Sequence, residues 1–88
     1  MAEKDDVLHY FYVLHCNDDT FYAGYTIAVE RRLKEHNDGI GAKYTRLAKR
    51  RPLLLLHYES FATKSEAMKQ EYAFKQLTRQ QKEIYLRG

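Results

Sequence analysis

The chain has 88 residues and a formal net charge of +3, with 44% hydrophobic and 31% charged residues. This balance is ordinary for a folded soluble protein and argues against a disordered chain. The run of four leucines at residues 53–56 is far too short to cross a membrane.

Two features bear on the compartment. The amino terminus MAEKDDV is acidic, and no apolar stretch of the length of a signal peptide follows it. The single cysteine, Cys16, lies in an apolar segment and has no partner for an internal disulfide, so we expect a buried thiol. We therefore expect a cytoplasmic protein with no membrane partner, folded as one domain over residues 1–88 with its core at about residues 9–85.

The predicted elements begin with a hairpin. An apolar strand over residues 7–16 and a second strand over 20–26 flank the turn Asn17-Asp18-Asp19. Thr26 begins a predicted helix over residues 27–37.

The second half of the chain begins with a basic segment at 41–51, which is expected to be a short helix or a compact loop. A proline then precedes a third strand at 53–61. Thr63 and Glu66 match a capping box, which predicts a helix to about residue 76. Thr78 caps a last short helix to residue 86. This order predicts an α/β fold with a small three-stranded antiparallel sheet flanked by helices.

The positive charge is concentrated at residues 31–51, which carry eight basic and two acidic side chains, whereas residues 1–30 carry one basic and six acidic ones. Such a segment suits a polyanion, because neutralised phosphates supply most non-specific nucleic-acid affinity. The alternative, to which we give equal weight, is a solvated helix face with flexible lysines. The candidate nucleic-acid-binding residues are Lys43, Arg46, Lys49, Arg50 and Arg51.

Gly24 interrupts an aromatic strand between Tyr22 and Tyr25. Glycine in a strand marks either a bulge or a place where another group approaches the backbone closely. We favour close approach, by the helix that bears Arg32 or by a substrate phosphate.

The hairpin also brings four tyrosines together: Tyr10, Tyr12, Tyr22 and Tyr25. Alternation puts Tyr10 and Tyr12 on one face of their strand. These tyrosines have two possible roles. They either stabilise the sheet by cross-strand aromatic packing, or one of their phenols binds phosphate or takes a proton from water.

Three residues on the predicted helices could carry chemistry. Arg32 and His36 are four apart and share a helix face. Arg32 is either a phosphate clamp or a surface arginine, and His36 is either catalytic or a packed or capping residue. Glu71 interrupts the apolar stripe of its helix, so it either pairs with Lys75 or holds a hard cation such as Mg²⁺.

Taken together, these positions resemble the GIY-YIG nuclease family. Tyr10-Phe11-Tyr12 stands in the place of the first tripeptide, and Tyr22-Ala23-Gly24 in the place of the second. The other matching segments are ERRLKEHN with Arg32 and His36, GAKYTR with Tyr44, and SEAMKQE with Glu71. The similarity to small single-domain bacterial members covers residues 9 to about 85.

The resemblance implies a metal-dependent endonuclease that hydrolyses phosphodiester bonds in nucleic acid, DNA more than RNA. Glu71 would hold one Mg²⁺ or Mn²⁺, and Arg32 would neutralise charge on the phosphoryl oxygens. Tyr12 or Tyr22 would accept a proton from the attacking water. His36 and Tyr44 complete the implied catalytic set. The alternatives are a non-catalytic nucleic-acid-binding module and a protein-binding adaptor.

Overall fold

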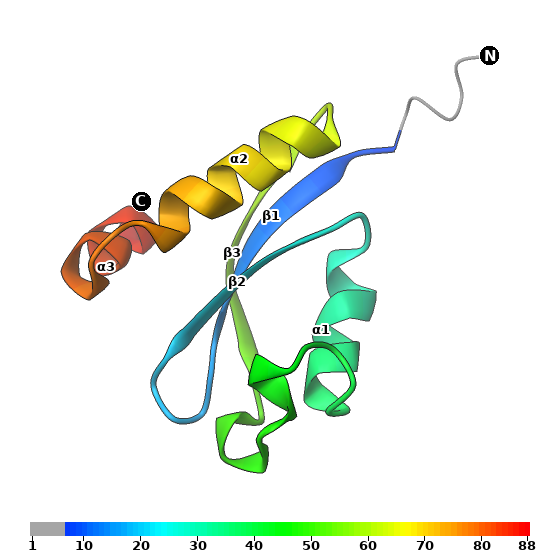
Figure 1. Cartoon of the computed structure of the whole chain (residues 1–88), viewed down its shortest axis with the longest axis vertical. Coiled ribbons are helices and arrows are strands. Elements are labelled where there is room, and N and C mark those ends of the chain that lie inside the picture. Colours follow the sequence, from blue (N-terminus) through cyan, green and yellow to red (C-terminus); the bar gives the residue numbers. More distant parts are fainter. Residues whose placement is uncertain (1–6) are drawn as a thin grey trace.

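A computed structural model describes residues 7–88, and the acidic amino-terminal residues 1–6 lie outside the described part. Figure 1 shows the arrangement of the elements. In chain order they are β1 (His9–His15), β2 (Phe21–Thr26), α1 (Val29–Asn37), η2 (Tyr44–Arg46), η3 (Ala48–Arg50), β3 (Leu54–Phe61), α2 (Lys64–Lys75) and α3 (Arg79–Arg87). The prediction of an α/β fold with three antiparallel strands is confirmed.

The sheet has the strand order β2-β1-β3, so β1 lies in the centre. In this register Tyr12 faces Gly24 on β2 and Tyr58 on β3. The ladder between β1 and β2 is regular. A bulge shifts the pairing of β1 with β3 between Val13 and Leu14.

Because successive side chains of a strand point to opposite faces, β1 supplies two cores. On one face Tyr12, Leu14 and Cys16 pack with Leu53. On the other face Phe11, Val13 and Ala23 pack with Phe74 of α2. Helix α1 covers the first face, which we call the Tyr12 face, and helices α2 and α3 cover the second, the Phe11 face (Figure 1).

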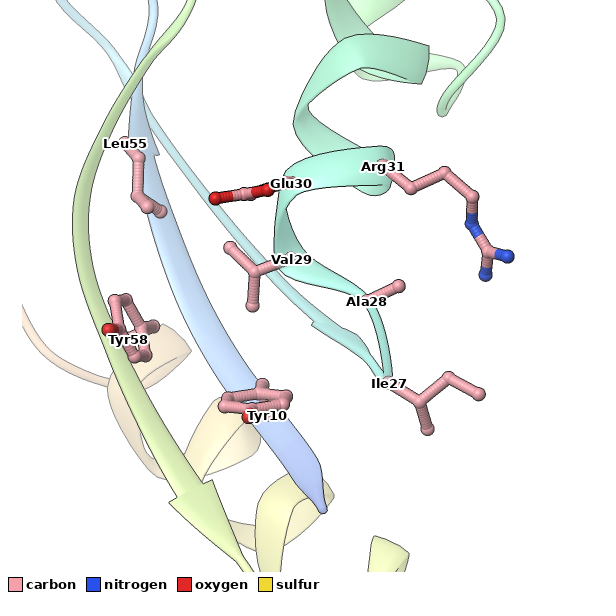
Figure 2. Close-up of a pocket in the computed structure, with 8 residues that line it drawn as sticks. All are labelled: Tyr10, Ile27, Ala28, Val29, Glu30, Arg31, Leu55 and Tyr58. Carbon is pink, nitrogen blue, oxygen red and sulfur yellow. The ribbon is translucent and has the colours of Figure 1, made fainter. Parts of the chain in front are cut away.

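The four tyrosines of the hairpin divide between the two faces, which corrects the expectation that they gather. Tyr22 packs against the core of the Tyr12 face, and Tyr10 points from the same side of the sheet toward Val29 of α1 (Figure 2). Tyr25 is paired with Phe11 and so lies on the opposite face. There its hydroxyl lies 2.7 Å from Nδ1 of His9.

The helix ends follow the expected local rules, with one correction. Helices α2 and α3 both begin with a complete capping box, at Thr63 and at Thr78. Helix α1 begins at Val29 rather than at residue 27, because Thr26 still pairs with Tyr10 at the end of the β ladder. The Thr26 hydroxyl instead accepts the Ala28 N–H at 3.0 Å.

The basic segment at 41–51 forms the two short turns η2 and η3, in agreement with a compact loop. Arg50 fastens it to the hairpin turn, since its Nε lies 3.1 Å from the Asp18 carboxylate. Cys16 is the expected buried free thiol. Within residues 7–88 no helix has the length and apolar content that crossing a membrane requires.

Candidate active site

The space beside Gly24 is filled by Tyr12, the residue opposite it in the ladder. A Cβ on Gly24 would lie 2.5 Å from the Tyr12 hydroxyl oxygen and 2.7 Å from Cζ, both closer than atoms can approach. The expected close approach is therefore present, but the approaching group is a phenol of the neighbouring strand rather than α1. A bulge does not account for the glycine, because the ladder between β1 and β2 is regular.

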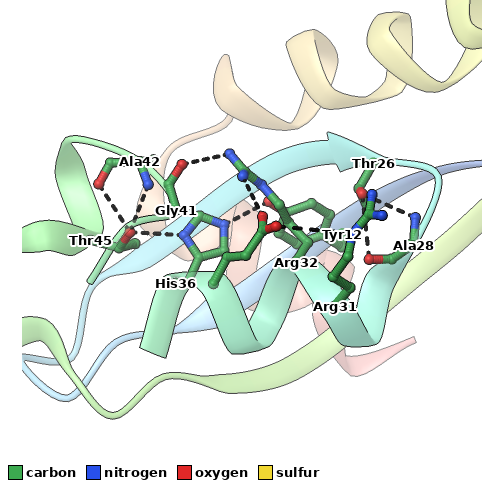
Figure 3. Close-up of polar contacts among 10 residues, drawn as sticks. Tyr12, Thr26, Ala28, Arg31, Arg32, His36, Gly41, Ala42 and Thr45 are labelled. Carbon is green, nitrogen blue, oxygen red and sulfur yellow. Dashed lines mark hydrogen bonds and ion pairs between the residues drawn. The ribbon is translucent and has the colours of Figure 1, made fainter. Parts of the chain in front are cut away.

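A hydrogen-bond chain runs from Tyr12 through α1 to the basic segment (Figure 3). The Tyr12 hydroxyl lies 2.8 Å from Nε2 of His36, and Nδ1 of His36 lies 2.8 Å from the Thr45 hydroxyl. Thr45 donates to the Ala42 carbonyl at 3.1 Å, so its oxygen accepts from Nδ1–H. Nε2 is therefore left to accept the proton of the Tyr12 phenol.

The protonation of this pair follows from its burial, since Tyr12 is 1% exposed and His36 is 0% exposed. Burial, reinforced by the positive charge of Arg32, lowers the pKa of His36 to about 4. Burial also raises the pKa of Tyr12, and the nearby Tyr22 and Glu71 add to that rise. At neutral pH the proton thus stays on the phenol, and the imidazole is neutral.

Arg32 lies beside this pair, and its guanidinium is close enough to lower the pKa of the Tyr12 phenol. It donates to the Glu35 carboxylate at 2.8 Å and to the Gly41 carbonyl at 2.7 Å (Figure 3). A half-buried arginine held by two such bonds keeps a defined position. It is therefore not a mobile surface side chain, and the role of phosphate clamp stays a prediction.

Glu71 lies on α2, and its negative charge acts on Tyr12. Its side chain is 17% exposed, and one carboxylate oxygen lies 2.8 Å from the Lys75 ammonium. Within residues 7–88 no three His, Cys, Asp or Glu side chains cluster, which excludes a zinc-type ligand set in that part. A single carboxylate fits Mg²⁺ or Mn²⁺, because such ions often take their remaining ligands from water and substrate phosphate.

Tyr22 and Tyr44 form an aromatic wall beside the pair. Their rings stack at a centroid distance of 5.9 Å, and the Tyr22 ring lies 4.9 Å from that of His36. On Tyr44 the Arg50 guanidinium lies 3.6 Å from the ring centroid. The structure thus brings Tyr12, Tyr22, His36 and Tyr44 together, with Arg32 beside them.

The five basic candidates separate into two groups. Lys43, Arg46 and Lys49 are exposed. Arg50 is bound to Asp18 and to the Tyr44 carbonyl, and Arg51 donates to the Arg46 carbonyl. The first group is free to meet a polyanion, whereas the second holds the loop itself.

A hollow of about 500 Å³ opens at the other end of α1, between that helix and β3 (Figure 2). The side chains of Tyr10, Val29, Leu55 and Tyr58 point into it. The Glu30 side chain also points into this space, whereas Arg31 points away from it (Figure 2). A carboxylate inside an otherwise apolar hollow disfavours phosphate.

Two residues of the site were missed in the sequence. Thr45 is fully buried and orients His36, yet it lies in a basic segment that predicts an exposed loop. Gly41 is required because a Cβ there would lie 2.5 Å from Nδ1 of His36. The only signal was a glycine four residues before a threonine in GAKYTR, which is too weak to assign a role.

The site thus combines a buried tyrosine–histidine pair, an arginine beside it and a carboxylate that acts on the phenol from a second helix. The family model described as the GIY-YIG catalytic domain matches residues 8–84. The chain belongs to the GIY-YIG family.

Its relatives include small bacterial proteins. The UPF0213 protein of Enterococcus faecalis (strain ATCC 700802 / V583) is 67% identical over 79 residues, which are 90% of each chain. The UPF0213 protein YazA of Bacillus subtilis (strain 168) is 56% identical, over 89% of this chain and 77% of the relative.

Two solution NMR structures are similar to the fold. The protein EF2693 from E. faecalis is 66% identical with a TM-score of 0.62, over 91% of this chain and 83% of that chain. The UPF0213 protein BH0048 from Bacillus halodurans is 47% identical with a TM-score of 0.58, over 90% of this chain and 82% of that chain.

Proposed function

We propose that this protein is a divalent-cation-dependent endonuclease that hydrolyses phosphodiester bonds in nucleic acid. We favour DNA over RNA as its substrate. The observation that carries the proposal is the hydrogen bond of the Tyr12 phenol to a neutral, fully buried His36. It is the arrangement that lets a phenol exchange a proton without releasing it to water. Its buried free Cys16 agrees with a protein that acts in the cytoplasm.

Tyr12 is the proton acceptor in this proposal. As the attacking water gives a proton to the phenolic oxygen, the phenol's own proton passes to Nε2 of His36. Within residues 7–88 Tyr22 has no comparable hydrogen-bonded acceptor, although it lies nearer the surface. His36 acts through Tyr12 and is therefore a positioning residue, held in its tautomer by Thr45.

The resting site opposes this transfer, because the pKa of the phenol is raised and that of His36 is lowered to about 4. A substrate phosphate beside Arg32 offsets the positive charge that helps to lower the His36 pKa. Glu71 is the residue that would hold a divalent cation, which would stabilise the leaving oxygen and oppose the effect of the carboxylate on Tyr12. Activity is thus expected to require both groups.

One observation favours a second candidate, a module that binds nucleic acid without cutting it. The Glu71 carboxylate is already paired with Lys75 at 2.8 Å, as the ion-pair alternative predicts. If Glu71 stays paired with Lys75 in the presence of a cation, the site has no metal ligand. Only the basic face then remains to bind nucleic acid.

Glu71→Gln separates the two candidates. Cleavage is measured with Mg²⁺ and with EDTA on single-stranded, duplex, flapped and branched DNA and on RNA. Line broadening by Mn²⁺ in NMR spectra reports cation binding independently of activity. We expect the variant to lose both cleavage and the broadening around residue 71, while its free energy of unfolding changes by about 0.5 kcal/mol or less.

Glu83→Gln is the matched control. It makes the same chemical change and also breaks an i,i+4 ion pair, with Arg79 at 2.9 Å, but it lies on α3. This control is expected to cut at the wild-type rate. Full activity of Glu71→Gln would refute the cation assignment.

A further inference from the structure

A second hollow, of about 240 Å³, lies along β2 between η2 and the two carboxyl-terminal helices. Two lysines, Lys75 of α2 and Lys82 of α3, line it together with four aromatic residues. The aromatic residues are Phe21, Tyr22, Tyr44 and Phe74. We call this hollow the lysine cleft.

The lysine cleft is continuous with the catalytic cluster. Tyr22 belongs to both, since it lines the cleft and its ring centroid lies 4.9 Å from that of His36. Lys75 joins them from the other side through its ion pair with Glu71. A strand whose scissile phosphate lies beside Arg32 can therefore extend into the cleft.

The charge of the cleft suits a phosphate. Within residues 7–88 Lys82 has no acidic partner, and its Nζ lies 5.5 Å from the Phe74 ring centroid. Lys75 becomes available when Glu71 binds a cation. The larger hollow at the other end of α1 holds the Glu30 side chain, and Arg31, which also lines it, points its side chain away (Figure 2).

The rings of these aromatic residues are already in contact with other side chains. The Tyr22 and Tyr44 rings stack on each other, and Arg50 covers Tyr44. Likewise the Arg79 guanidinium lies 4.0 Å from the Phe21 ring centroid. The ring faces that these contacts cover are closed to a base, whereas the positive ring edges, like the lysines, attract an anion.

We propose that the lysine cleft binds a backbone phosphate adjacent to the scissile one, through Lys82 and Lys75 and without stacking the base. The assignment rests on the proposed nucleic-acid function and adds a specific property. Recognition at this subsite is independent of base identity, because only the phosphate is held.

The test is binding in EDTA, so that it does not depend on cleavage. NMR spectra of the labelled protein are recorded during addition of thymidine 3′,5′-bisphosphate. We expect the shifted signals to include Ala23 and Lys82, because without a cation Lys75 stays paired with Glu71. Shifts confined to residues 43–51 would overturn the proposal.

Substitution tests the charge. For a short single-stranded oligothymidylate, Lys82→Ala should reduce the slope of log affinity against log salt by about 0.7. The matched control Lys69→Ala removes an exposed lysine of α2 outside the cleft and should leave the slope unchanged. Lys82→Arg keeps the charge and should restore the slope, which excludes a purely structural effect.

Base independence is tested with the same oligonucleotide carrying abasic positions, which is expected to bind with equal affinity. A marked loss would show that a base is held and would overturn the proposal. If the wild type cleaves nucleic acid but Lys82→Ala leaves the salt slope unchanged, the phosphate subsite is refuted and the nuclease proposal stands. A reduced slope without any cleavage supports the cleft and refutes the nuclease.

Discussion

The phenol of Tyr12 has two separable parts. Its ring fills the space beside Gly24, and its hydroxyl is the hydrogen-bond partner of His36. Removing the hydroxyl alone leaves the packing and breaks the proton path. The proposed chemistry can therefore be tested apart from the fold.

Tyr12→Phe should lower the rate of cleavage about 10²-fold or more, as expected for lost general-base catalysis. It should also cost about 1–3 kcal/mol of stability, since Nε2 of His36 is left buried without a partner. Rates and urea unfolding measure the two effects. Tyr10→Phe is the control and should be nearly silent, because within residues 7–88 the Tyr10 hydroxyl has no hydrogen-bond partner. A wild-type rate in Tyr12→Phe, with loss of activity in Tyr22→Phe, would transfer the role to Tyr22.

His36 predicts a pH dependence of stability. Its pKa is lowered to about 4 in the folded state, against about 6.5 when unfolded. Between these values only the unfolded chain binds the proton, so stability falls as the pH falls from about 6.5 to about 4. Above about 6.5 the imidazole is neutral in both states and contributes no pH dependence.

The expected loss over that window is of order 3 kcal/mol. Urea unfolding across the window measures it. His36→Gln removes this titration, so its stability should depend less steeply on pH than that of the wild type. Parallel curves for the two proteins would contradict the burial of a neutral imidazole.

At the scale of the elements, the basic segment serves both as binding surface and as support for the site. Lys43 and Arg46 are exposed, whereas Arg50 is bound to Asp18 and lies over the Tyr44 ring. Lys43 and Arg46 are therefore free to bind a polyanion, whereas the charge of Arg50 holds the loop in place.

Replacing Lys43 and Arg46 together by Ala should reduce the salt slope of nucleic-acid affinity by about 1–2 and leave stability nearly unchanged. Arg50→Ala should instead act mainly on stability, which should fall because the ion pair, hydrogen bond and ring contact of Arg50 are all lost. Fluorescence anisotropy at several salt concentrations and thermal unfolding distinguish them. An unchanged slope in the double variant would leave these residues as solvated surface.

At the scale of the whole molecule, the sheet separates the Tyr12–His36 pair on the Tyr12 face from α2, which carries Glu71, and α3 on the Phe11 face. On the Phe11 face Tyr85 of α3 packs against Phe74 at a ring distance of 5.5 Å and donates to the Glu59 carboxylate. Burial, together with that carboxylate, raises the pKa of Tyr85 to about 12, so the hydroxyl remains a donor. Helix α3 is thus attached to the sheet on the side opposite His36.

Tyr85→Ala should lower the free energy of unfolding by about 2–4 kcal/mol, since it removes a large packed side chain. Cleavage at a temperature where the variant is folded should remain at the wild-type rate, because the Tyr12–His36 pair lies across the sheet and α2, which carries Glu71, keeps its own contact of Phe74 with Phe11. Ile84→Ala is the neighbouring control, and at 56% exposed it should cost about 0.5 kcal/mol or less. Lost activity in a folded Tyr85→Ala protein would show that the two faces are coupled.

The sequence by itself determined the class of fold, the strands, the caps of the last two helices and the residues of the family motif. These signals are local. A capping threonine and its glutamate are three residues apart, and alternation is visible within one strand. Helix α1 was placed two residues early because pairing with another strand held Thr26 in the ladder.

Only the tertiary structure decided what fills the gap at Gly24, why His36 is neutral, and which cations are free to bind. Tyr12 lies opposite Gly24 in the β ladder, and Thr45 of the basic segment contacts His36 of α1. Asp18 of the hairpin turn contacts Arg50 of η3. Each contact joins residues that are distant in the chain. Burial then shifts the pKa of Tyr12 and of His36, and burial is a property of the packed molecule rather than of any segment.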